Sequence, residues 1–177
     1  MKPRVIFQAV SVAATAVTVA AKIIENKKLE QVAKPLIVAP LINIKDPFMV
    51  VGGVCHIAGD IVLSRKHRKL EHGAACFALG HCVMTARQIV RGVKPQYPAA
   101  HFLVWLLAAG MIRDPKLVSY AGVLALFSSY SRSIGGPLFI LSDSLIIVNK
   151  RFPHRFIDAA VIATYGSAQL KLFAPDN

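Results

Sequence analysis

The sequence contains few charged residues, and acidic residues are the scarcest of them. Only 17% of its 177 residues are charged, against about 25% in soluble domains, whereas 55% are hydrophobic. A soluble domain of this size cannot bury that much apolar surface, but a helical membrane protein has lipid as its solvent. The composition therefore argues against an ordinary soluble domain and favours an all-α, polytopic membrane protein.

Several patterns typical of catalytic or metal sites are absent. The three cysteines show no metal-ligand spacing, no His-x3-His or Glu-x2-His pair occurs, and Gly-x-Ser-x-Gly is missing. We therefore expect no metal site, and we expect no serine hydrolase of the soluble type.

The net charge of +12 would favour nucleic-acid binding in a soluble protein. Here the basic residues gather in the gaps between apolar runs, for example at Lys27-Lys28, in the loop 65–69 and at Lys150-Arg151. This distribution is typical of loops that face anionic lipid headgroups. We expect the bilayer to be a partner and nucleic acid not to be one.

Eight apolar runs divide the chain, and no low-complexity linker separates them. The runs cover about 5–24, 33–44, 47–64, 70–90, 98–112, 116–131, 133–149 and 155–173. The second, fifth and sixth are shorter than the roughly 17–25 residues of a full membrane span. The first resembles a signal peptide, but its length favours a retained helix. We predict one domain, 1–177: a multi-pass bundle of about eight short transmembrane helices, in the plasma membrane if the source is bacterial.

Two aspartates lie inside apolar runs, Asp60 in the third and Asp143 in the seventh. A carboxylate deep in a membrane costs roughly 2.5–3.5 kcal/mol on insertion scales, so such residues usually mark a proton path, an ion site or catalysis. The other seven acidic residues fall in loops, at helix ends or at the chain terminus. We expect the two aspartates to form a paired site in a central polar cleft that opens to lipid or to one interface.

A weak internal repeat relates the two aspartates. The segment 59–63, GDIVL, resembles 142–146, SDSLI, and each is followed by a basic loop and another apolar run. His81 and Tyr165 follow the respective aspartates at nearly the same distance. The pattern suggests two halves of four helices in parallel orientation, with the aspartates at similar depth.

Short motifs in five of the runs occur in a specific order. They are Lys34-Pro35-Leu36, then 59–63, then Gly73, Phe77 and His81, then 139–145 with Asn149 and Phe152, and finally Thr164-Tyr165 with Ala168-Gln169. Over about 34–90 and 134–173 the chain thus resembles the YhhN family of membrane proteins, the lysoplasmalogenases. The resemblance implies an eight-helix membrane hydrolase and no cofactor. Its substrates would be lysoplasmalogens, which are lysophospholipids with one vinyl-ether chain, and its products a fatty aldehyde and a glycerophospho-alcohol.

Vinyl-ether hydrolysis requires a proton donor to carbon and a negative group near the resulting oxocarbenium ion. Two carboxyl groups in different protonation states supply both, as in glycosidases. A low-dielectric site disfavours a charged carboxylate, and a second carboxylate nearby disfavours it further. We therefore hypothesise that one of Asp60 and Asp143 donates the proton. The other would stay ionised, stabilise the cation and orient water, and the sequence leaves open which does which.

Further polar residues are candidates for supporting roles, each with helix packing as the alternative. His81 would tune the site or relay protons, and His56 shares a helix face with Asp60. Tyr165 and Gln169, four residues apart, would hydrogen-bond a carboxylate or the glycerol of the substrate, or else join helices.

Three more candidates lie near the ends of the runs or beside an aspartate. Lys34, near a membrane edge, would hold the substrate phosphate as a point charge. Ser142 and Asn149 would support the site around Asp143, or simply pack.

Two other functions are compatible with paired membrane acids. A proton- or cation-coupled transporter or channel would suit the two carboxylates and the parallel repeat. Intramembrane aspartyl proteases resemble a Gly-x-Gly-Asp pattern, but Ile57 stands at the first glycine position here. Their Tyr-Asp motif is absent as well, because Ser142 precedes Asp143.

Overall fold

A computed structural model describes residues 3–65 and 69–174, and this part of the chain forms helices and contains no strand. The α-helices are α1 (Pro3–Ile23), α2 (Lys27–Ala33), α3 (Pro47–Ser64), α4 (Leu70–Val90), α5 (Pro98–Met111), α6 (Pro115–Tyr130), α7 (Gly135–Arg151) and α8 (Arg155–Leu172). The predicted all-α class is confirmed, and each run from the third to the eighth corresponds to one helix. Residues 66–68 of the predicted basic loop lie outside the described residues.

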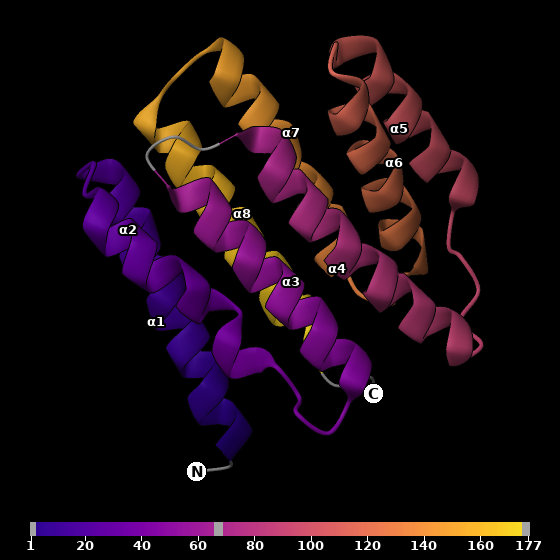
Figure 1. Cartoon of the computed structure of the whole chain (residues 1–177), viewed down its shortest axis with the longest axis horizontal. Coiled ribbons are helices and arrows are strands. Elements are labelled where there is room, and N and C mark those ends of the chain that lie inside the picture. Colours follow the sequence, from indigo (N-terminus) through magenta and orange to yellow (C-terminus); the bar gives the residue numbers. More distant parts are fainter. Residues whose placement is uncertain (1–2, 66–68, 175–177) are drawn as a thin grey trace.

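The second predicted run, 33–44, is not a continuous helix. After α2 the chain forms two short 3-10 helices, η1 (Lys34–Ile37) and η2 (Ala39–Leu41), and the whole segment packs along α1. Pro35 and Pro40 account for the interruptions, because proline lacks an N–H donor and clashes with the preceding turn of an α-helix. The broken segment still returns the chain from the end of α1 to the start of α3 (Figure 1).

Two helix pairs, α3 with α4 and α7 with α8, form the middle of the bundle (Figure 1). On one side α1 packs against α8. On the other side α6 packs against α4, and α5 packs against α6. The fourth helix of each predicted half therefore contacts its predecessor and also an early helix of the other half. Because α6 is the second helix of its predicted half and α1 is the first, the two contacts are not equivalent, and the predicted repeat of four helices stays a prediction.

Glycines allow α3 and α4 to approach each other closely. A Cβ atom at Gly59 would lie 2.6 Å from the ring of Phe77, and one at Gly80 would collide with the ring of His56. Close approach through small residues is common between membrane helices. The contact fixes the position of α3 against α4, and with it the position of Asp60.

The start of α3 is held by Asp46. Its carboxylate accepts hydrogen bonds from the backbone N–H groups of Phe48 and Met49, and it forms an ion pair with Arg87 on α4 at 2.7 Å. Burial acts to raise the pKa of Asp46, but the hydrogen bonds from Arg87 and Met49 outweigh it, so the pKa lies below its ordinary value of 3.8. The resulting stabilisation is present above that ordinary value and is lost as the pH falls through the lower pKa of the folded state.

Replacing Asp46 by Asn keeps a capping side chain but removes the charge opposite Arg87. We expect this variant to lose about 1.5–3 kcal/mol of stability at neutral pH, because a hydrogen bond to a charged group contributes roughly that amount. Thermal unfolding midpoints in detergent, measured from neutral to acidic pH, check the prediction. The difference between parent and variant should shrink at the acidic end. A difference that stays constant would show that the ion pair is not its source.

Within residues 3–65 and 69–174, two helices are long and apolar enough to cross a membrane, namely α1 over Arg4–Ile23 and α3, and α5 is apolar but shorter. Large apolar side chains are also exposed on the surface of the bundle, for example Phe7 on α1 and Phe102 and Leu107 on α5. Extensive exposed apolar surface marks contact with lipid or with another protein. The predicted multi-pass topology stays a prediction.

Candidate functional site

Asp60 on α3 and Asp143 on α7 line one small cavity inside the bundle. The cavity has a volume of about 50 Å³, and α4, α6 and α8 contribute the rest of its wall together with η1. A space of this size is large enough for a water molecule. The polar residues in its lining are Lys34, Asp60, Tyr120, Ser142, Asp143 and Tyr165, and the remaining ones are apolar.

Asp60 is fully buried and has two polar neighbours. The hydroxyl group of Tyr165 donates to Oδ2 at 2.6 Å, and the Lys34 ammonium group lies 3.4 Å from Oδ1. Lys34 is itself buried, and its ammonium group faces Asp60. Because a buried carboxylate is costly without an opposite charge, the ion pair accounts for the inward position of Lys34.

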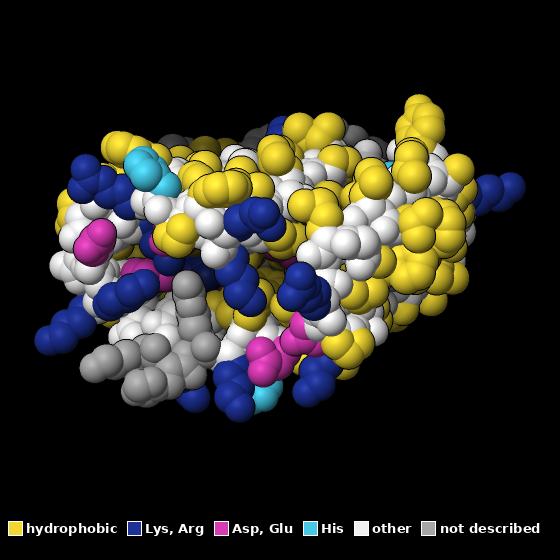
Figure 2. All heavy atoms as spheres, turned by 90° about the horizontal axis from the view of Figure 1, so that it is seen from above, with side chains coloured by type: hydrophobic (Ala, Val, Ile, Leu, Met, Phe, Trp, Pro, Cys, Tyr) yellow, Lys and Arg dark blue, Asp and Glu magenta, His cyan; other side chains and the backbone are white. Residues whose placement is uncertain are grey.

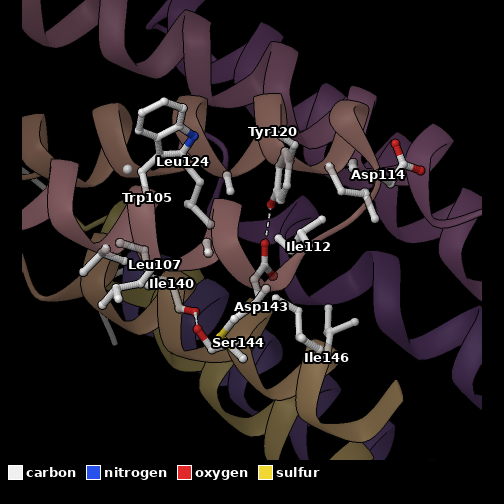
Figure 3. Close-up of a pocket in the computed structure, with 18 of the residues that line it drawn as sticks. Trp105, Leu107, Ile112, Asp114, Tyr120, Leu124, Ile140, Asp143, Ser144 and Ile146 are labelled. Atoms are coloured by element: carbon white, nitrogen blue, oxygen red, sulfur yellow. Dashed lines mark hydrogen bonds between the residues drawn. The ribbon is translucent and has the colours of Figure 1, made fainter. Parts of the chain in front are cut away.

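Asp143 has a different environment. It is half-buried, and the hydroxyl group of Tyr120 on α6 donates to its Oδ2 at 2.5 Å (Figure 3). No Lys or Arg in the described part of the chain lies within salt-bridge distance of Asp143. The two carboxyl groups therefore share a cavity, but among the described residues only Asp60 has a Lys or Arg within ion-pair distance.

Tyr120 was not identified from the sequence as a site residue. The available signal was its position inside an apolar run, because the hydroxyl group of a buried tyrosine usually finds a hydrogen-bond partner. Nothing in the sequence indicated that this partner would be Asp143, since the contact joins two helices.

A larger pocket adjoins the cavity between the α5–α6 hairpin and α7. Its volume is about 560 Å³, and five residues line both spaces: Leu70, Ala74, Tyr120, Asp143 and Ile146. Asp143 therefore stands where the pocket meets the cavity, with its carboxyl group directed toward Tyr120 (Figure 3).

The walls of the larger pocket are mainly apolar, and its Lys and Arg residues lie at one end. Trp105, Leu124 and Ile140 belong to the apolar wall (Figure 3), whereas Arg113 and Lys150 lie where α5 turns into α6 and where α7 ends. Figure 2 views this end of the molecule. Lys and Arg side chains surround a hollow in the middle of the face, and the part formed by α5 and α6 is mainly hydrophobic.

His81 and Gln169 do not line the cavity. Gln169 pairs with Nδ1 of His56 at 3.1 Å, which joins α8 to α3. His81 is fully buried, and neither of its ring nitrogens has a hydrogen-bond partner in the described structure. Its ring stacks on Phe127, with centroids 4.4 Å apart, and lies 5.0 Å from the ring of His56. These residues form part of the packed aromatic core of the bundle.

Ser142 and Asn149 also have clear positions. Ser142 lines the cavity, and its hydroxyl group donates to the carbonyl group of Val161 at 3.0 Å, joining α7 to α8. Asn149 accepts a hydrogen bond from the His154 N–H at 2.8 Å and so stabilises the turn between α7 and α8. Asn149 is not part of the cavity lining. Among the described residues, no group of three or more His, Cys, Asp or Glu is placed to hold a metal ion.

Comparison with known proteins assigns the chain to a family. No curated protein and no solved structure matches it. A model of the YhhN family matches residues 4–175, which is nearly the whole chain. The chain therefore belongs to the YhhN family.

Proposed function

We propose that the protein is an integral membrane hydrolase that cleaves the vinyl-ether bond of lysoplasmalogens, with Asp60 and Asp143 as its catalytic pair. The observation that carries the proposal is the single cavity lined by both carboxyl groups. The YhhN match and the resemblance of the chain's motifs to this family of lysoplasmalogenases support the substrate class. The products are a fatty aldehyde and a glycerophospho-alcohol.

A multi-pass membrane location is part of this proposal. The length and apolar character of α1 and α3 support it, and so does the exposed apolar surface of α5. Lipid would solvate that surface, and the basic loops would lie among the headgroups. Substrate would then reach the site from the bilayer itself.

The neighbours of the two carboxyl groups suggest different roles for them. The Lys34 ammonium group, 3.4 Å from Asp60, favours the negatively charged form of that carboxyl group. Asp143 has no such cation among the described residues and lies beside apolar walls, which favours its neutral form. We assign Asp143 as the proton donor and Asp60 as the carboxylate that stabilises the cation.

The reaction starts when Asp143 protonates the alkenyl carbon that is remote from the ether oxygen. The electron pair of the double bond forms the new C–H bond, and the carbon next to oxygen becomes an oxocarbenium ion that the Asp60 carboxylate stabilises. Water attacks this carbon while Asp60 takes a proton from the water, and the product is a hemiacetal. In the collapse Asp60 returns its proton to the leaving glycerol oxygen, and Asp143 takes the proton of the hemiacetal hydroxyl group.

The decisive experiment follows fatty aldehyde release from lysoplasmenyl phospholipids by purified protein in detergent. Choline and ethanolamine headgroups should both be tried. We expect aldehyde to form in detergent, because an enzyme, unlike a transporter, does not need a membrane that separates two compartments. Folded protein that releases no aldehyde would refute the proposal. Proton or cation movement across sealed vesicles, without a chemical product, would instead favour a transporter.

A further inference from the structure

We infer that the 560 Å³ pocket between the α5–α6 hairpin and α7 binds the single hydrocarbon chain of the lysophospholipid, and that Lys150 and Arg113 at its mouth bind the phosphate group. The inference rests on the proposed function and specifies how the same site recognises its substrate. It assigns the phosphate contact to residues other than Lys34.

The character of the pocket fits a hydrocarbon chain. Ligand pockets typically enclose about 300–1,000 Å³ and are lined mainly by apolar side chains. This pocket falls within that range, and Trp105, Leu124 and Ile140 give it an apolar wall. Because Asp143 lines both this pocket and the cavity, a chain lying in the pocket would place its first carbons beside the proton donor.

Along each of two helices the pocket lining changes from a charged residue at the mouth to apolar residues inside. On α7 the order from the mouth inward is Lys150, Asp143 and Ile140. On α6, after Asp114 at the mouth, the order is Tyr120 and then Leu124. A lysophospholipid has the same order, with its charged headgroup first, then the ether bond and finally the chain.

The spacing along α7 also matches the headgroup. Lys150 lies two helical turns beyond Asp143, which corresponds to about 10 Å along the axis. A glycerophosphate unit and the reach of the lysine side chain together cover that distance. Both Lys150 and Arg113 are exposed, so their charges are available to a ligand. Asp114 lies at the same end, but its carboxylate caps α6 by accepting from the Lys116 N–H at 2.8 Å.

Lys34 is a poor candidate for the phosphate contact. Its ammonium group is buried and forms an ion pair with Asp60, and it does not line the larger pocket. Drawing it toward a phosphate would leave Asp60 as an unpaired buried charge, which is costly.

Binding of a non-cleavable lysophospholipid, with an alkyl ether in place of the vinyl ether, tests the inference without requiring turnover. Ala108→Trp places a large side chain in the pocket from α5. We expect its affinity for the long-chain analogue to fall by about tenfold or more, as measured by titration calorimetry in detergent. Gly110→Trp is the matched control, because Gly110 faces open space on the same helix and should leave the affinity unchanged.

The headgroup contact has its own test. Lys150→Gln should weaken binding of the alkyl lysophospholipid by about tenfold, since a hydrogen bond to a charged group is lost. It should not weaken binding of the alkylglycerol that lacks phosphate. The control is Arg151→Gln, because Arg151 is adjacent in sequence and is not part of the pocket lining. Lys150 is exposed, so its replacement leaves the fold intact.

The outcomes separate this inference from the proposed function. Unchanged affinity of both Ala108→Trp and Lys150→Gln for the analogue overturns the inference, whether or not the parent protein releases aldehyde. Weakened binding by both variants, with both controls normal, supports the inference even if the parent protein releases no aldehyde. In that case the pocket binds a lysophospholipid, and it is the hydrolysis that has to be abandoned.

Discussion

Asp143→Asn is expected to lower kcat for aldehyde release by about a thousandfold or more, because an amide has no acidic proton to deliver to the alkenyl carbon. Asparagine has the shape of aspartate, and its carbonyl oxygen still accepts the hydrogen bond from Tyr120. The fold should therefore be retained. Asp60→Asn is expected to cause a comparable loss, since the neutral amide does not stabilise the oxocarbenium ion. Single-turnover aldehyde release, with binding measured separately, checks both variants.

A matched control makes the result specific to the cavity. Asp158→Asn introduces the same chemical change on α8, at a carboxylate that lines neither the cavity nor the larger pocket, and it should leave turnover near normal. Near-normal turnover in both Asp60→Asn and Asp143→Asn would contradict the carboxylate pair. Loss of turnover in only one of the two variants would show that a single carboxyl group is essential for the reaction.

The helices of this fold were largely predictable from the sequence, because the length of an apolar run and the polar residues that interrupt it set the ends of a helix. The run 47–64 coincides with α3, and its N-terminal boundary is set by Asp46 as a cap and Pro47 at the first helical position. The prediction of one continuous helix over the run 33–44 was wrong, although the sequence shows Pro35 and Pro40 in this run. Hydropathy alone does not distinguish an α-helix from a sequence of 3-10 turns.

The candidate site was predictable only in part. Aspartates at similar depth in two apolar runs indicated a pair, and the structure places both on one cavity. The partners of the two carboxyl groups were not predictable, because Tyr120 and Lys34 reach them across helix contacts that no local pattern encodes. Similarly, the i, i+4 spacing of Tyr165 and Gln169 placed them on one helix face. Only the position of α8 relative to α3 in the folded bundle determines that Tyr165 contacts Asp60 whereas Gln169 contacts His56.

A second large effect is expected when the ion pair between Lys34 and Asp60 is broken. Lys34→Met is expected to destabilise the protein by up to about 3–5 kcal/mol, because removing one partner of a buried ion pair leaves the other charge uncompensated or forces it to take up a proton. The variant should also be nearly inactive, since Asp60 would then bind a proton and would not stabilise the cation. Thermal unfolding in detergent and aldehyde release measure the two effects separately. Lys28→Met, at an exposed lysine on α2, is the matched control and should show neither effect.

The double variant Lys34→Met/Asp60→Asn distinguishes an electrostatic role of Lys34 from simple packing. If the ammonium group serves mainly to balance the Asp60 charge, the neutral amide removes the need for it, and much of the lost stability returns. Activity should not return, because the negative group that the oxocarbenium ion requires is still absent. Additive stability losses in the double variant would show that Lys34 acts through packing alone. Recovery of stability without recovery of turnover would instead show that Lys34 balances the buried charge of Asp60 and that this charge is needed for the reaction.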